Sequence, residues 1–197
     1  MNINHTARML LATALMLTAC EAEQEYSTWP CRFAYKNDIH VDATLASVMD
    51  YNSRGIFCLI SESVFAGKKY LNFKNNLGDE SQQPESAEEE EAKYILGLNN
   101  GIIVGFQTLN TEPNGGFVGY DAQCPNCVRR ENNMLSPTYY VDVAFSGIGT
   151  CRKCHKRYDL NNNGIVLDGE KDDTGLQKYA ASTTAPYGYI SVGTKRY

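Results

Sequence analysis

The sequence predicts a mainly β fold of antiparallel strands with at most one short helix. Residues that favour strands, above all Tyr, Val, Ile and Phe, are frequent after residue 30. Turn-forming residues interrupt the apolar runs at short intervals, which is typical of all-β domains. One stretch, Ala43–Asp50, has helical spacing, because Leu45, Val48 and Met49 would share one face of a helix.

The expected strands follow the apolar runs in chain order. Asn99, Asn100 and Gly101 separate two of these runs and have the composition of a tight hairpin turn, so the flanking strands are expected to pair antiparallel. The strands are expected at Cys31–Tyr35, Ile56–Ser61, Tyr70–Phe73, Tyr94–Leu98, Ile102–Gln107, Phe117–Tyr120, Thr138–Phe145, Leu176–Ser182 and Gly188–Val192.

The segment Gly78–Ala92 breaks this pattern because it is rich in carboxylates. It contains the run Glu88–Glu91 and further acidic residues on both sides of Pro84. Like charges at this density repel one another and stay in water, so the segment is expected to be an exposed, mobile loop. Binding of calcium or of a partner is the alternative interpretation.

Length and charge exclude some classes of protein. The chain has 197 residues and a formal net charge of −5. Residues 30–197 suffice for one domain with a sizeable core. A mildly acidic chain without a broad basic surface argues against nucleic acid as a partner. After residue 19, no segment is long and apolar enough for a transmembrane helix.

The N-terminus has the pattern of a secretion signal. Arg8 provides a positive start, Met9–Ala19 is an apolar run too short to span a bilayer, and small residues precede Cys20. Leu17–Cys20 resembles the lipobox of bacterial lipoproteins, which implies that residues 1–19 are removed and that Cys20 is lipidated. Several acyl chains on Cys20 would make the membrane attachment stable. A buried N-terminal helix is the alternative.

Residues 20–29 are expected to form an acidic tether between the lipid and the domain. Glu21, Glu23 and Glu25 alternate there with small or polar residues. The stretch also resembles the acidic signal that directs some Gram-negative lipoproteins to the outer face of the outer membrane. The expected location is therefore the outer membrane, with the bilayer as partner through the lipid on Cys20; a simple spacer is the alternative.

Four cysteines form the strongest chemical motif in the chain. Cys124 and Cys127 form one CxxC pair, and Cys151 and Cys154 form a second pair 23 residues later. Each pair can close a tight turn that directs both sulfurs toward one ion, and two such turns supply a tetrahedral zinc site or the thiolates of an iron–sulfur cluster. Two disulfides, which an exported protein could form, and free thiols are the alternatives.

Basic residues flank both CxxC pairs. They are expected to lower the pKa of the thiols and to offset the negative charge of zinc held by four thiolates. These basic residues are Arg129, Arg130, Arg152, Lys153, Lys156 and Arg157.

From about Tyr94 to the end, the chain resembles a Rieske domain. In the second loop of that family a cysteine, two residues and a histidine precede an aromatic-Asp-Leu strand and a Gly-rich turn. The resemblance implies an antiparallel β-sandwich over residues 30–197, with a two-loop, zinc-ribbon-like metal-binding subdomain at about residues 121–170. The similar segments are Asp121–Cys124, Cys151–Leu160, Gly164–Val166, Leu176–Tyr179 and Tyr189–Val192.

The ligand positions depart from the Rieske pattern. Cys154 occupies the place of the second-loop histidine, Cys127 replaces the first-loop histidine one position further along, and His155 falls one residue late. Histidine ligands raise the potential of a Rieske centre, so four thiolates would give a low-potential, oxygen-sensitive 2Fe–2S cluster. A surface location then favours structural zinc in a non-catalytic module; a 2Fe–2S electron-transfer protein serving an oxidoreductase is the alternative.

Two further motifs compete with this interpretation. Cys151–His155 also matches the CxxCH attachment sequence of c-type haem, which would leave Cys124 and Cys127 without a role. Asp159–Glu170 matches a simple calcium loop, but Leu167 at its ninth position cannot ligate, so a Gly-rich hairpin turn is expected instead.

The remaining candidate residues carry no catalytic motif. Cys31 and Cys58 lie in apolar strands and form either a disulfide or two separate buried thiols. His40 is isolated in the sequence and is expected to be structural. No Ser-His-Asp or Cys-His order indicates a nucleophile, so an enzyme is not the expected class.

Overall fold

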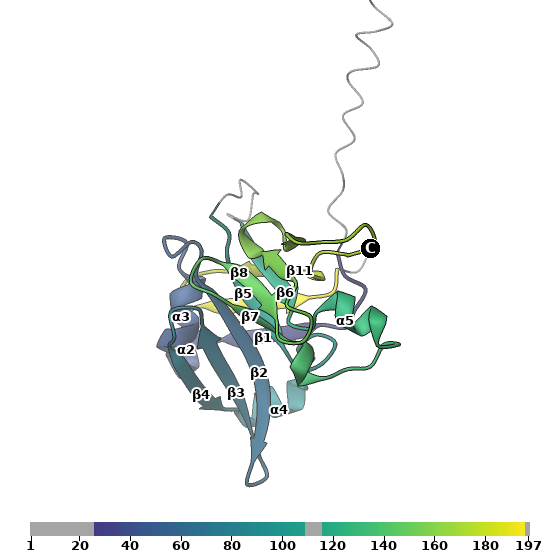
Figure 1. Cartoon of the computed structure of the whole chain (residues 1–197). Helices are drawn as coiled ribbons and strands as arrows, with labels where there is room; N and C mark the ends of the chain where they lie inside the picture. Colours follow the sequence, from purple (N-terminus) through teal and green to yellow (C-terminus); the bar gives the residue numbers. More distant parts are fainter. Residues whose placement is uncertain (1–25, 109–115, 196–197) are drawn as a thin grey trace, which may run out of the picture.

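The computed structural model describes residues 26–108 and 116–195, which form a mainly β structure built around one curled sheet (Figure 1). Every pair of neighbouring strands within its sheets is antiparallel, so the predicted fold class is confirmed. The expected signal at residues 1–19 and Cys20, the expected lipidation site, lie outside the described residues.

The larger sheet has eight strands in the order β1-β12-β11-β6-β5-β2-β3-β4. Its two ends are β1 and β4, and strands distant in sequence meet where β11 pairs with β6. The bounds are β1 Arg32–Lys36, β2 Phe57–Phe65, β3 Lys68–Asn75, β4 Glu80–Pro84, β5 Ile102–Phe106, β6 Phe117–Asp121, β11 Lys178–Thr183 and β12 Tyr189–Gly193.

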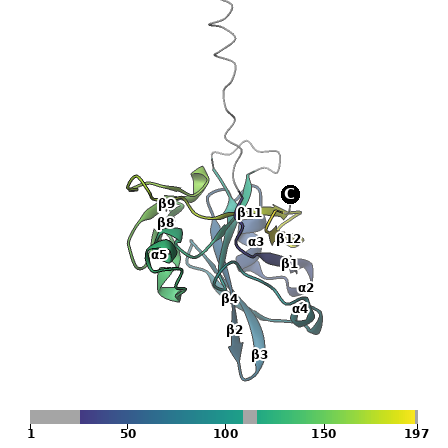
Figure 2. The ribbon, with the colours of Figure 1, turned by 90° about the vertical axis from the view of Figure 1, so that its right-hand side faces the viewer.

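A smaller sheet lies beside the larger one and has the order β10-β9-β8-β7 (Figure 2). Its strands come from one continuous stretch of chain between β6 and β11, so it is a local meander. The bounds are β7 Val141–Val143, β8 Ile148–Cys151, β9 Arg157–Asp159 and β10 Ile165–Val166.

The central strands β5 and β6 are buried at every position because hydrophobic clusters cover both of their faces. Ile102 and Val104 pack into the main core, which the curled sheet forms together with a helix. Ile103 points the other way, into a second core between the sheet and the cysteine-bearing loops. A strand buried on both faces is uniformly apolar, which explains the unbroken run in the sequence.

Four short helices accompany the sheets in the described residues, which corrects the expectation of at most one. The expected helix is present as α3, Ala43–Met49, and buries Leu45, Val48 and Met49 in the main core. The other three are four to six residues long, too short for a repeating apolar pattern to reveal them. They are α2 Asn37–His40, α4 Ala87–Ala92 and α5 Pro125–Arg130.

The expected strand at Tyr94–Leu98 is wrong, although an apolar sequence suggested it. Ile95 makes only an isolated bridge with Arg32, and Gly97 has a φ of +67°, which turns the chain out of the extended conformation. The backbone N–H of Leu98 then donates to the carboxylate of Asp121 at 2.6 Å. Residues Asn99–Gly101 turn the chain as expected, but they do not join two strands.

The expected strand at Thr138–Phe145 is shorter in the structure. Residues Pro137–Tyr139 form a 3₁₀ turn, and only Val141–Val143 is extended. Pro137 fixes the backbone in a turn conformation before the strand can begin.

Gly78–Ala92 is not a mobile loop, which corrects that expectation. Residues Glu80–Pro84 form strand β4 along β3, and Ser86 and Glu89 form a reciprocal capping box at the start of α4. The Glu89 carboxylate also lies 3.0 Å from Nε2 of His40, which ties α4 to α2. The many acidic residues are tolerated because most of them point into solvent at the edge of the sheet.

Asp42 connects this segment to the main core. Its buried carboxylate caps α3 by accepting from the N–H of Leu45 at 2.8 Å. It also accepts from Ser81 Oγ and Gln83 Nε2 of β4, both at 2.9 Å. Three donors therefore converge on one side chain.

Replacing Asp42 by alanine is expected to lower the free energy of unfolding by about 3 kcal/mol. Loss of an N-cap costs about 1 kcal/mol, and two further side chains lose a charged acceptor. Urea unfolding monitored by circular dichroism measures this change. Asp79→Ala is the matched control in the same region, and an equal loss for the two variants would contradict the role of Asp42.

The packed domain begins before residue 30, so the last part of the expected tether is incorporated into it. Ser27 is buried and its N–H donates to the carbonyl of Lys178 at 2.7 Å. Trp29 packs partly buried against both cores. The described residues include no helix with the length and apolar character that crossing a membrane requires.

Candidate metal centre

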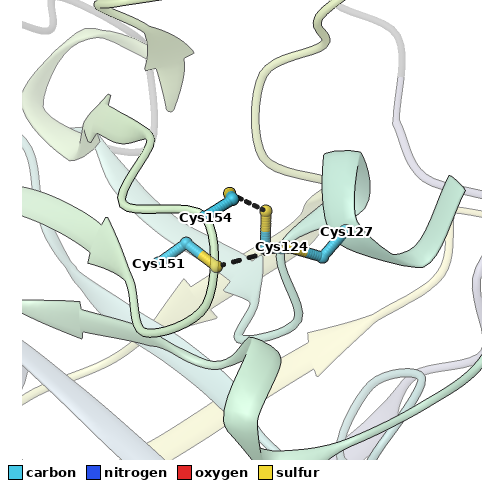
Figure 3. A group of neighbouring side chains, drawn as sticks. All are labelled: Cys124, Cys127, Cys151 and Cys154. Carbon is cyan, nitrogen blue, oxygen red and sulfur yellow. Dashed lines mark hydrogen bonds between the residues drawn. The ribbon is translucent and has the colours of Figure 1, made fainter. Parts of the chain in front are cut away.

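The two CxxC pairs meet in the structure (Figure 3). The four Sγ atoms lie within 4.8 Å of one another, so the cysteines could together hold a metal ion. Two contacts join one pair to the other: Cys124 Sγ lies 3.7 Å from Cys154 Sγ, and Cys127 Sγ lies 3.6 Å from Cys151 Sγ. Cys124, Cys127 and Cys151 are buried, and Cys154 is partly exposed.

The first pair is positioned by the end of β6 and the start of α5. Cys124 is the extended residue before the helix, Pro125 favours the first helical position, and Cys127 lies in the first turn. The N–H of Cys124 donates to the carbonyl of Tyr139 at 2.8 Å, which fixes the loop against the segment before β7. Helix geometry thus brings both sulfurs of this pair to one side.

The second pair lies in the turn between β8 and β9. Cys151 ends β8, its N–H donates to the carbonyl of Lys156, and the N–H of His155 donates to the carbonyl of Cys151, both at 3.0 Å. His155 has a φ of +59°, and this left-handed residue reverses the chain. The narrow turn presents Cys154 toward the first pair.

A buried hydroxyl and a buried amide support the cluster from behind. Tyr158 of β9 places its hydroxyl 3.0 Å from Cys124 Sγ, where it can donate to the sulfur. Asn126, inside the first CxxC pair, donates to the same hydroxyl at 2.9 Å and to the carbonyl of Thr174 at 2.9 Å. Such outer contacts orient ligands and strengthen metal binding. The residues between the first two cysteines therefore also contribute to the site.

Most of the basic residues around the cysteines are paired with carboxylates. Arg152 makes a two-pronged contact with Asp142, at 2.7 and 2.9 Å. The Asp173 carboxylate, almost fully buried, is in ion-pair contact with Lys156 and lies 3.1 Å from Arg130. Through Asp173, the turn that follows Cys154 is tied to the helix that carries Cys127.

These ion pairs correct the expectation that nearby cations lower the pKa of the thiols. Burial raises the pKa of the Cys127 thiol to about 12. Contact with Cys151, together with burial, raises the pKa of the Cys124 thiol well above its ordinary value. With these raised pKa values the thiols hold their protons when no metal is bound. A metal ion binds thiolates, so its binding is expected to release protons.

The competing motifs find no support in this geometry. Haem attachment requires both sulfurs of Cys151 and Cys154 on one porphyrin, whereas the sulfur of Cys151 is buried against Cys127. The candidate calcium loop forms the β9–β10 hairpin, as expected. Its side chains have other partners: Asp159 accepts from the N–H of Asn161, and Asn163 accepts from Lys178.

Cys31 and Cys58 are separate free thiols in the structure. Both are buried in the main core, and neither belongs to the four-cysteine cluster. The sequence left open a disulfide or two separate thiols, and in the structure the two cysteines are not bridged.

Asp121 is a site residue that sequence reasoning did not single out. Its buried carboxylate accepts from the N–H of Leu98 at 2.6 Å, from the N–H of Gln123 at 2.7 Å and from the hydroxyl of Tyr179 at 2.7 Å. It thereby fixes the end of β6, from which the loop to Cys124 departs. An acidic residue at the end of an apolar strand is the only signal that could have indicated it.

Comparison of the chain with protein-family models, with curated protein sequences and with solved structures found no match. The fold and the site define the class of this protein: a mainly β domain with a small second sheet that carries a four-cysteine cluster able to bind a metal.

Proposed function

We propose that this chain is a lipid-anchored bacterial lipoprotein whose Rieske-like domain is stabilised by one structural zinc ion on Cys124, Cys127, Cys151 and Cys154. The observation that carries the proposal is the spacing of the sulfurs. Four thiolates at about 2.3 Å from zinc form a tetrahedron with edges of about 3.8 Å. The Sγ contacts Cys127–Cys151 and Cys124–Cys154, at 3.6 and 3.7 Å, are near this edge.

The same spacing favours a single ion over a 2Fe–2S cluster. A cluster divides its four cysteines between two irons, so sulfurs on different irons lie further apart than sulfurs on one ion. Here all four sulfurs are within 4.8 Å of one another, with no division into two separated pairs. A redox-silent ion is also consistent with the replacement of both expected histidines by cysteines.

A structural role is favoured over a catalytic one. Catalytic zinc keeps one position open for water or substrate, whereas four protein thiolates close the coordination shell. Three of the four cysteines are buried, and the outer contacts from Tyr158 and Asn126 fill the surroundings. The ion would join two loops and the second core, so its binding energy becomes folding energy.

Metal analysis of protein purified without oxygen tests this proposal. We expect one zinc per chain, no acid-labile sulfide and a colourless solution. Two irons with two sulfides per chain and a brown-red colour would instead support the electron-transfer alternative. A single iron without sulfide would contradict zinc while keeping the mononuclear site.

The anchoring part of the proposal rests on the sequence before the described domain. The lipobox-like Leu17–Cys20 precedes a short acidic stretch, and the packed domain begins a few residues later at Ser27. Such an arrangement would hold the domain close to the membrane surface, at the outer membrane if the acidic stretch acts as a sorting signal.

Cys20→Ala is expected to abolish lipid attachment and to release the protein into the soluble fraction. Metabolic labelling with radioactive palmitate in a Gram-negative host measures this directly. Cys31→Ala, which removes another cysteine near the N-terminus, is the control that should keep its label. Palmitate incorporation into the Cys20→Ala variant would contradict the proposed anchor.

A further inference from the structure

The β2–β3 hairpin extends beyond the rest of the larger sheet. Strand β5 pairs with β2 only as far as Ile60, and β4 pairs with β3 only from Tyr70. The outermost hydrogen bonds to the hairpin come from two residues. The Asn100 side chain bonds to the backbone of Glu62, and the N–H of Glu85 donates to the carbonyl of Lys69. Residues Ser63–Lys68, the hairpin tip, project past these hydrogen bonds into solvent (Figures 1 and 2).

The hairpin tip is apolar where a solvent-facing turn is ordinarily polar. The residues Val64 and Phe65 are 65% and 73% exposed. Ala66 and Gly67 both have positive φ, +50° and +78°, as a two-residue hairpin turn requires. Asn, Asp or Gly ordinarily occupies the first of these positions, and alanine there is strained by about 1 kcal/mol. The turn thus carries a methyl group at the cost of backbone strain.

One exposed lysine follows the apolar residues. Lys68 is exposed directly opposite Phe65 in the strand register, and Lys69 is paired with Glu62 at 3.0 Å. Long basic side chains next to an exposed aromatic residue fit the bilayer interface, because the ring enters the apolar layer while the ammonium reaches the phosphates.

We propose that the hairpin tip is a membrane-contact site, in which Val64, Phe65 and Ala66 insert into the interface of a lipid bilayer and Lys68 contacts lipid phosphates. In both views the hairpin points away from the end of the molecule where the described chain begins (Figures 1 and 2). The contact is therefore separate from the proposed anchor at Cys20 and does not depend on it.

The expected affinity is weak. One Phe and one Val transfer less apolar area than a myristoyl chain, which by itself binds membranes only marginally. Half of the protein should therefore be bound at about 1 mM accessible lipid.

Tryptophan quenching tests the proposal with a chain of residues 21–197, which carries no lipid and keeps the whole described domain. Phe65→Trp is titrated with vesicles of phosphatidylethanolamine and phosphatidylglycerol that contain brominated acyl chains. We expect the new emission to be quenched and shifted to shorter wavelength. Phe65→Ser should weaken co-sedimentation with unlabelled vesicles by about tenfold, the effect of losing most of one buried aromatic side chain.

Two controls distinguish insertion of the hairpin tip from nonspecific binding of the protein to vesicles. Phe145→Trp replaces an aromatic residue that is 78% exposed in the turn between β7 and β8, and it should not be quenched. Wild-type protein, whose one tryptophan is Trp29, should likewise be unaffected. Absence of quenching in folded Phe65→Trp protein, or equal quenching in Phe145→Trp protein, would overturn the proposal. Dimerisation lost in Phe65→Ser without vesicle binding would show a protein contact instead.

Discussion

Replacing Cys124 by alanine is expected to abolish metal binding and to lower the free energy of unfolding by at least about 5 kcal/mol in the presence of zinc. The apparent binding free energy of structural zinc in small domains is about 10–16 kcal/mol. Only part of it should appear as lost stability in this chain, because the main core is separate from the metal site. Cys124 is fully buried, and its sulfur contacts both Cys154 and the Tyr158 hydroxyl. Urea unfolding with and without a zinc chelator measures the effect.

Loss of the metal should first destabilise the region around the site, before the whole domain unfolds. Hydrogen exchange is expected to accelerate in β7–β10 and α5, which pack in the second core beside the metal site, while β3 and the outer part of β2 stay protected. Cys58→Ala is the matched control, because Cys58 is equally buried but lies in the main core. It should keep zinc and lose only about 1–2 kcal/mol, the cost of a small buried side chain. Equal effects of the two variants would show that Cys124 acts by packing alone.

Asp121→Ala is expected to lower the free energy of unfolding by about 4 kcal/mol at pH 7. The change leaves three buried donors without an acceptor: the N–H groups of Leu98 and Gln123 and the hydroxyl of Tyr179. Each unsatisfied buried group costs about 1–3 kcal/mol. Thermal and urea unfolding measure the loss. A change below about 1 kcal/mol would contradict the central position of this carboxylate.

Asp121 also predicts a pH dependence of stability. Burial raises its pKa from 3.8 to about 6 in the folded protein, so the folded state holds this proton more tightly than the unfolded chain does. The associated stability is fully present below about pH 4 and is lost as the pH rises through about 6, by about 3 kcal/mol at most.

Asp121→Asn isolates this term, because the amide does not titrate. Its oxygen can still accept from two of the three donors, so the variant is expected to fold and to show a flatter profile between pH 4 and pH 7. Parallel urea unfolding of wild type and variant across this range measures the difference. Identical slopes in the two proteins would show that Asp121 does not carry the pH dependence.

The sequence predicts those parts of the fold in which one physical pattern dominates. Ile102–Gln107 and Phe117–Tyr120 are apolar because both faces are buried, and they are strands in the structure. Ala43–Asp50 shows helical spacing because one face enters the main core. The two CxxC pairs could be recognised because two intervening residues suffice to direct two sulfurs to one side.

Other parts depend on partners that sequence spacing does not reveal. Strand β4 has no apolar face; Ser81 and Gln83 are held by Asp42, which lies about 40 residues earlier. Tyr94–Leu98 has the composition of a strand, but the left-handed Gly97 packs against the Asp121 carboxylate, where a Cβ would lie 2.5 Å from Oδ2. Such tertiary contacts override local preference.

At the candidate metal site, too, some features could be predicted from the sequence and others depend on tertiary contacts. Four ligands could be named from the motif, but their pairing across the two loops follows from the way β6, α5 and the β8–β9 turn meet. The basic residues gave a misleading indication of low thiol pKa, because Asp142 and Asp173 are distant in sequence from most of the cations that they neutralise.

X-ray absorption at the zinc and iron edges of anaerobically purified protein tests the single four-cysteine ion most directly. We expect a zinc edge with four sulfur neighbours at about 2.3 Å and no second metal nearby. Loss of this signal in Cys124→Ala, and its retention in Cys58→Ala, would assign it to the cluster. An iron edge with a second iron in the neighbouring shell would contradict a single zinc ion and identify a 2Fe–2S electron-transfer centre.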